Sequence, residues 1–156
     1  LGSGFMDPNS DIIMPRNWSA TKFLCRMVQS DKHRLGERIL KKAEELIPSA
    51  TIGDLHFLYT AFIILLKKKK DTANMIRYCK KLIALSPFSK ESFSLEYGDF
   101  GAKSPRNLGY EAYAIYLQKE HLFAECVVVC EQAKAEGLKG EWDKRIVRAS
   151  RAMERS

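Results

Sequence analysis

The amino-acid sequence predicts an all-α protein made of antiparallel helical hairpins. Apolar residues recur at the helical spacing i, i+3, i+4, i+7 along most of the chain. The stretch Leu55–Pro87 combines an apolar run to Leu66, a polar break at 67–71 and a second amphipathic segment. The same offsets between apolar residues return in three successive units, so we expect about three hairpins followed by a C-terminal capping helix.

The composition agrees with a single folded domain. A chain of 156 residues can bury a sizeable core, and 46% hydrophobic with 29% charged residues is ordinary for a soluble globular protein. The four cysteines lie among apolar residues and no secretory signal is found, which favours reduced, buried thiols and a cytoplasmic location. The longest apolar run, Leu55–Leu66, is too short to span a bilayer, so no membrane partner is expected.

The N-terminal part begins with a polar, turn-rich segment. Residues 1–16 have the composition of an expression-tag remnant and are expected to be flexible. A first helix is expected over 17–29 and a second over 31–47, where Pro48 ends it.

The middle hairpin follows a short connection. Thr51 or Asp54 can cap its first helix, and Asp71 or Thr72 can cap its second. Pro87 is expected to end that second helix, because proline has no backbone N–H and clashes with the preceding turn.

The segment 88–107 is expected to be an irregular insertion between repeats, because Gly98, Gly101 and Pro105 interrupt it. A long segment of this kind is either packed on the helical body or part of a binding surface. Helical spacing resumes at Leu108.

The C-terminal part predicts a third hairpin and a cap. Its two helices are expected to join at Glu120–His121, and Gly137 is a good terminator for the second of them. A capping helix is expected over about 141–154, starting at Trp142, with one apolar side and basic residues on the others.

Matching sets of apolar residues mark the three hairpins. The first helices carry Ala20, Phe23, Leu24 and Met27, then Tyr59, Phe62, Ile63 and Leu66, then Tyr110, Tyr113, Ala114 and Leu117. The second helices carry Gly36, Leu40 and Ala43, then Met75, Cys79 and Leu82, then Cys126, Cys130 and Ala133. With units of about 34 residues, prolines at Pro48 and Pro87 and an acidic turn residue at Asp71, this pattern resembles the tetratricopeptide repeat.

The resemblance implies a right-handed solenoid that forms one domain over 17–155. Its repeats would lie at about 17–50, 56–89 and 107–140. Proteins of this family bind peptides or other proteins on a concave face and usually catalyse nothing. The segment Tyr113–Ile146 also resembles the C-terminal part of bacterial tetratricopeptide-like proteins, which suggests a bacterial or phage origin.

The resemblance places the concave face on the first helix of each hairpin, on the side away from the matching apolar sets. That side is unusually apolar here, which predicts a groove for a peptide or helix of a partner protein. The expected contact residues are Trp18, Phe57, Thr60, Ile64, Lys67, Lys68, Glu111, Ile115 and Lys119.

Two other functions stay open. The net charge of +7, the lysines at 67–70 and the C-terminal arginines would suit a nucleic-acid partner. Cations at a helix C-terminus are also favoured by the helix dipole alone. The groove could instead be filled by the N-terminal segment, by the 88–107 insertion or by a second copy of the chain, which would give a homodimer or a self-associating scaffold.

No catalytic or cofactor motif is found in the sequence. It has no glycine-rich phosphate loop, no GxSxG and no HExxH. Cys126 and Cys130 are spaced i, i+4 but lack a second ligand pair, so no zinc site is expected. The sequence therefore predicts a protein that is not an enzyme and that holds no metal or cofactor.

Overall fold

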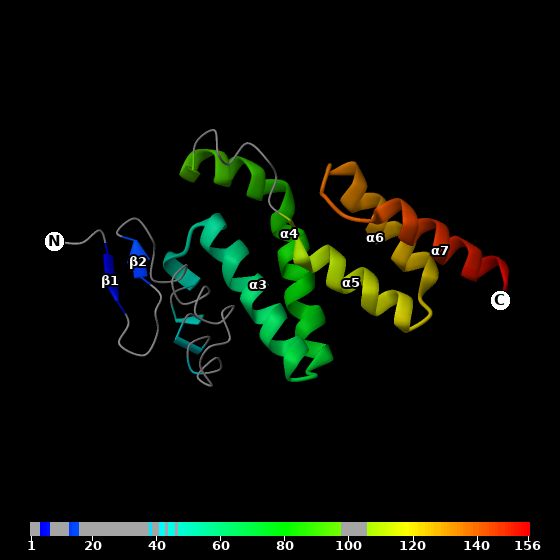
Figure 1. Ribbon diagram of the computed structural model, residues 1–156, viewed down its shortest axis with the longest axis horizontal. Coiled ribbons are helices and arrows are strands. Elements are labelled where there is room, and N and C mark those ends of the chain that lie inside the picture. Colours follow the sequence, from blue (N-terminus) through cyan, green and yellow to red (C-terminus); the bar gives the residue numbers. More distant parts are fainter. Residues whose placement is uncertain are drawn as a thin grey trace.

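The computed structural model describes residues 4–6, 13–15, 38, 41–42, 44–45, 47–97 and 106–156 (Figure 1). The elements are β1 (Gly4–Met6), β2 (Ile13–Pro15), the 3-10 helix η1 (Ile47–Ser49), α3 (Ile52–Lys68), α4 (Thr72–Tyr97), α5 (Leu108–Lys119), α6 (Phe123–Ala135) and α7 (Trp142–Glu154).

The N-terminal part contains a short strand pair where the sequence predicts no regular structure. β1 and β2 are antiparallel, with Gly4 opposite Pro15 and Met6 opposite Ile13. The helix predicted over 17–29 lies outside the described residues, as does most of the one predicted over 31–47.

Side-chain caps fix the start of the helices in the α3–α4 hairpin. The Thr51 hydroxyl oxygen accepts a hydrogen bond from the Asp54 backbone N–H at 3.1 Å, so α3 begins after Thr51. A carboxylate oxygen of Asp71 accepts from the Asn74 backbone N–H at 3.3 Å at the start of α4. Of the two candidates predicted at each position, the structure selects Thr51 and Asp71.

The α3–α4 and α5–α6 hairpins are joined by the same turn. Lys70 has φ 59° and His121 has φ 60°, both in the left-handed region. In the first turn the Asp71 N–H donates to the Leu66 carbonyl, and in the second the Leu122 N–H donates to the Leu117 carbonyl. Each turn also has the inner bond from the left-handed residue to the carbonyl three positions earlier, which completes a Schellman motif.

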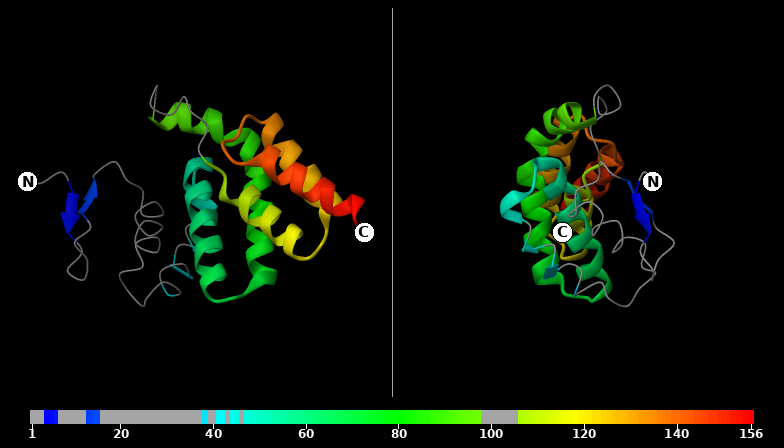
Figure 2. Two further views of the ribbon diagram at one scale, coloured as in Figure 1. Left: turned by 45° about the vertical axis from the view of Figure 1, so that its right-hand side comes forward. Right: turned by 90° about the vertical axis from the view of Figure 1, so that its left-hand side faces the viewer.

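Consecutive helices pack against one another from α3 to α7, and α3 also contacts α5 (Figure 2). Every regular element that the structure describes between Ile52 and Glu154 is a helix, which confirms the all-α part of the predicted fold class. The right-handed solenoid of the tetratricopeptide family stays a prediction.

The buried residues form two cores. The first core lies between α3 and α4, and the second joins α5, α6 and α7. The first contains Leu58, Ala61, Phe62, Ile63, Met75, Tyr78, Cys79, Leu82 and Ala112. The second contains Tyr110, Ala114, Leu117, Cys126, Cys130, Ala133, Leu138, Trp142 and Ala149. The inward faces predicted for both second helices are thus confirmed, and α5 contributes to both cores.

The prediction that Pro87 ends a helix is wrong. α4 continues through Pro87 to Tyr97, so the predicted irregular insertion is helical over 88–97, while 98–105 lie outside the described residues. A helix bends at an internal proline because the ring displaces the carbonyl four residues earlier, and Figure 1 shows α4 sharply bent.

α4 continues past Pro87 because a proline cannot form the hydrogen bond that closes the end of a helix. α6 stops because Gly137 adopts φ 74° and the following Leu138 N–H donates to the Ala133 carbonyl at 3.1 Å. Pro87 holds the position that corresponds to Leu138 and has no N–H for this bond. The chain therefore bends instead of terminating, and the buried Asn107 side-chain amide donates to the Leu82 carbonyl at 3.2 Å.

Candidate binding grooves

A first groove lies between the end of α3, the start of α4 and one face of α5, and we call it the α3–α5 groove. Its volume is about 340 Å³. The apolar part of its lining comes from Leu66, Met75, Ala112, Ile115 and Tyr116. The positively charged part comes from Lys67, Lys70 and Lys119. Glu120 is the acidic residue among the lining side chains that the structure describes.

Three of the predicted contact residues meet in this groove. Lys67 comes from α3, and Ile115 and Lys119 come from α5. Lys67 and Lys119 are exposed, while Ile115 is half-buried. α3 and α5, the two described helices that are predicted to form the concave face, therefore contact each other. The groove between them is lined by residues near their C-terminal ends.

Other predicted contact residues are engaged within the body. Phe57 packs against the first core, with its ring edge-on to His56 at 5.8 Å between centroids. The Thr60 hydroxyl donates to the His56 carbonyl at 2.7 Å. The Arg106 guanidinium donates to both carboxylate oxygens of Glu111, with a shortest N–O distance of 2.6 Å.

The remaining predicted contacts lie apart from the α3–α5 groove. Ile64 is half-buried on α3 and Lys68 is exposed, and neither lines the groove. Trp18 lies outside the described residues. Phe57 and Ile64, predicted to lie on the apolar concave face, do not line the α3–α5 groove.

The sequence reasoning missed two features that shape this region. Met75, interpreted as core, is 9% exposed and also lines the groove. Gly109 lets α5 approach α4, because a Cβ there would lie 2.8 Å from the Cys79 carbonyl oxygen and 3.0 Å from the Leu82 Cβ. A glycine in the first turn of an otherwise apolar helix was the available signal for this close approach.

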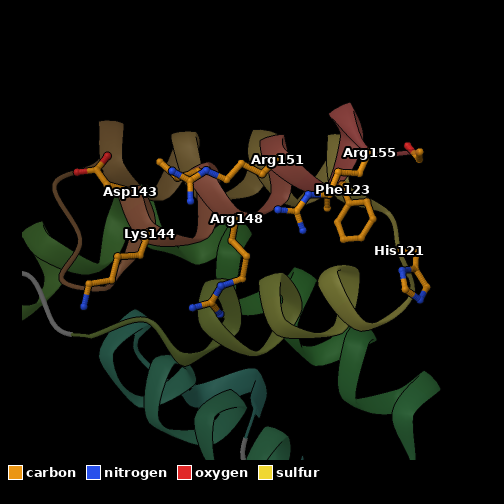
Figure 3. Close-up of a pocket in the computed structure, with 10 residues that line it drawn as sticks. His121, Phe123, Asp143, Lys144, Arg148, Arg151 and Arg155 are labelled. Atoms are coloured by element: carbon orange, nitrogen blue, oxygen red, sulfur yellow. The ribbon is translucent and has the colours of Figure 1, made fainter.

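A second, larger groove follows the outer face of α7, and we call it the α7 groove. Its volume is about 890 Å³. Lys144, Arg148, Arg151 and Arg155 line it from α7, together with Val147 and Ala152 (Figure 3). His121 contributes from the α5–α6 turn and Phe123 from the start of α6. The sequence predicts these basic residues as the solvated side of a capping helix, and the C-terminal arginines also as a candidate nucleic-acid contact.

Three buried titratable groups are held in their neutral forms. Burial raises the pKa of the Cys79 and Cys130 thiols to about 12, and burial lowers the pKa of the His56 imidazole to about 4. Neither kind of group is charged near neutral pH, and none of them lines either groove. The side chains that line the two grooves are mainly cations, aromatic rings and apolar groups, with Glu120 in the α3–α5 groove and Asp143 in the α7 groove.

The described residues contain neither a cluster of metal ligands nor a membrane-spanning helix. Within them, no three histidine, cysteine, aspartate or glutamate side chains come together as metal ligands. No helix among them is both long enough and apolar enough to cross a membrane.

Comparison of the chain with protein-family models, with curated proteins and with solved structures finds no match.

Proposed function

We propose that this chain is a protein-binding module that holds an acidic, amphipathic segment of a partner protein in the α3–α5 groove. The observation that carries the proposal is the arrangement of three lysines, Lys67, Lys70 and Lys119, around an apolar floor. The tetratricopeptide resemblance supports the same mode of binding, because it implies a peptide-binding surface on these helices.

The size of the α3–α5 groove limits how much of a partner protein can enter it. A volume of about 340 Å³ accepts a few side chains and not a folded domain. Leu66, Met75 and Ile115 offer contact to apolar anchors of a peptide. Short segments with apolar residues on one side match this floor.

The positive charge around the apolar floor favours a bound segment that carries negative charge. Lys67, Lys70 and Lys119 are all exposed, and they come from both hairpins. Cations at a rim raise the association rate of acidic partners and disfavour basic ones. The net charge of +7 acts in the same direction at longer range.

Phage display of random short peptides tests the proposal without a known partner. We expect the full chain to select peptides that combine Asp or Glu with apolar residues. A selected peptide, fluorescently labelled and measured by anisotropy, should bind at least about tenfold more weakly to the Lys67→Glu/Lys119→Glu variant, a loss of about 1.4 kcal/mol. Ile115→Ala should weaken binding by a smaller factor.

A matched control is the Lys41→Glu/Lys139→Glu variant, because both lysines are exposed, lie outside the α3–α5 groove and give the same change in net charge. The proposal fails if this control loses binding equally, or if the selected peptides are basic or lack apolar residues. It also fails if light scattering over a dilution series shows a dimer that Ile115→Glu dissociates, because the groove would then hold a second copy of the chain.

A further inference from the structure

We propose that the α7 groove is a separate binding site for single-stranded nucleic acid, in which a row of cations tracks the phosphates and an aromatic ring stacks on a base. This site shares no lining residue with the α3–α5 groove. The outcome of its test is therefore independent of the outcome of the protein-binding test.

The cations form one straight row. Lys144, Arg148, Arg151 and Arg155 are spaced i, i+4, i+7 and i+11, so at 100° per residue they fall on one face of α7. Trp142 and Ala149 are buried on the opposite face. The row presents about one charge per helical turn over roughly 16 Å. A regular row of this kind suits a ligand that repeats its negative charge along its length.

These cations are available to an external ligand. All four are exposed. Lys144 pairs with Glu141 at 2.8 Å. Among the described residues, the side chains of Arg148, Arg151 and Arg155 form no ion pair or hydrogen bond, although the charge of Arg148 also interacts with that of Glu141. The acidic residue in the lining, Asp143, is paired with Lys134 at 2.7 Å.

Arginine is the side chain that suits phosphate best, and three of the four cations are arginines. The planar guanidinium can donate two parallel hydrogen bonds to a phosphate group. A lysine-rich solvated surface would offer only point charges. The residue type therefore adds geometric selectivity to the sign of the charge.

Aromatic rings lie at the C-terminal end of the row. Phe123 is half-buried and contacts His121 edge-on at 5.5 Å between ring centroids. Figure 3 shows Phe123 beside Arg155, with His121 toward the turn. Cations along a backbone path next to an aromatic platform are the combination that single-strand-binding proteins use, and stacking tolerates any base.

The two grooves differ in what they offer an acidic protein segment. The α3–α5 groove has an apolar floor made by five side chains. On the outer face of α7 the large aliphatic side chain is Val147, which is 48% exposed, and four cations surround it. A surface dominated by charge, with one ring at its end, fits a polyanion better than a helix that needs an apolar pocket for its anchor residues.

Fluorescence anisotropy with labelled oligothymidine and oligouridine tests the site in the full chain. We expect binding in ~50 mM salt, with the logarithm of the association constant falling by about 3 per decade of salt concentration, as four released counterions on a single strand require. The Arg148→Gln/Arg151→Gln variant should lose at least tenfold in affinity. Phe123→Leu, which keeps an apolar side chain against the second core, should lose roughly fivefold.

Matched variants decide between this site and general charge. Lys41→Gln/Lys139→Gln removes the same charge elsewhere on exposed residues and should bind nearly as tightly as the wild-type chain. Lys67→Glu/Lys119→Glu, which disrupts the α3–α5 groove, is also expected to retain most of the oligonucleotide binding.

Several results would overturn the proposal. They are the absence of binding in ~50 mM salt, an affinity that does not depend on salt, equal losses in the arginine and lysine double variants, and binding of polyglutamate as tight as that of an oligonucleotide of equal charge. The last result would assign the α7 groove to an acidic protein instead. A duplex that binds as tightly as the single strand would equally contradict the assignment of the ligand.

Discussion

The α3–α4 and α5–α6 hairpins begin alike and end differently. Both turns place a residue other than glycine, Lys70 or His121, in the left-handed region with the same pair of closing hydrogen bonds. At the far end, α6 stops at Gly137 while α4 bends at Pro87 and continues. The comparison shows that a helix end depends on one residue that can adopt positive φ and a following N–H that can donate.

The two cores also differ in how they fill equivalent positions. In the α3–α4 hairpin, Ile63 and Leu82 fill two inward positions of the first core. The α5–α6 hairpin has the small residues Ala114 and Ala133 at inward positions, and Tyr110 and Trp142 meet there at 6.3 Å between centroids. The same offsets along the sequence therefore support different partners, because the second hairpin must also seat α7.

The largest expected difference between the hairpins is in their response to pH. His56 is 3% exposed in the α3–α4 hairpin and has its pKa lowered to about 4 by burial. The unfolded chain binds a proton near pH 6.5 and the folded one does not, so the free energy of unfolding falls as the pH drops from about 6.5 to 4. The expected loss is about 3 kcal/mol, which urea unfolding over a pH series measures.

The His56→Gln variant supplies the comparison for that series. It should show a shallower decline in the free energy of unfolding over the same pH window. His121→Gln is the matched control, because it makes the same substitution at an exposed position. Equal slopes for the wild type and His56→Gln would show that the imidazole is protonated in the folded state.

The next largest effect is expected at the caps. Asn107 is 2% exposed, accepts from the Tyr110 N–H at 3.2 Å and donates to the Leu82 carbonyl at 3.2 Å, so it caps α5 and holds the bend of α4 together. Asn107→Ala should cost about 2–3 kcal/mol in the free energy of unfolding. Asp71→Ala removes a capping hydrogen bond that is exposed to solvent and should cost only about 0.5–1 kcal/mol. Equal costs in thermal unfolding would contradict the double role of Asn107.

A smaller loss is expected at the end of α6. Gly137 has φ 74° and open space around the position of a Cβ, so Gly137→Ala introduces backbone strain without a steric clash. The expected cost is about 1 kcal/mol, measured by urea unfolding. A stabilising effect would show that the α6 end does not require positive φ.

The smallest effects are gains at the two turns. Lys70→Gly and His121→Gly each relieve a non-glycine residue in the left-handed region. Each should raise the free energy of unfolding by about 0.5–1 kcal/mol, after the larger entropy of glycine in the unfolded chain is subtracted. Because the turns share one geometry, the two gains should be similar in size, and unequal gains would show that the turns are not equivalent.

Much of the fold could be predicted because it depends on local features. The caps at Thr51 and Asp71, the terminator Gly137 and the apolar positions around Cys79 and Cys130 all follow from residues close together in the chain. The continuation of α4 could not be predicted in this way. It involves Asn107, which comes from another part of the chain and reaches the Leu82 carbonyl only in the folded state.

The candidate site was predictable in part for the same reason. Lys67, Ile115 and Lys119 lie on helix faces that periodicity identifies. Phe57 was interpreted as a contact residue because α3 is apolar nearly all round, yet the first core covers it in part. The α7 groove depends on Phe123 from the start of α6, which no pattern within α7 could indicate.

The place of α5 in both cores has a thermodynamic consequence. Ala112 belongs to the first core, and Tyr110, Ala114 and Leu117 belong to the second. α5 therefore couples the unfolding of the two cores, because residues of this one helix are buried in both. When one core unfolds, the other loses the helix surface against which it packs. We therefore expect the two cores to unfold in one cooperative transition, and the two grooves to be lost together.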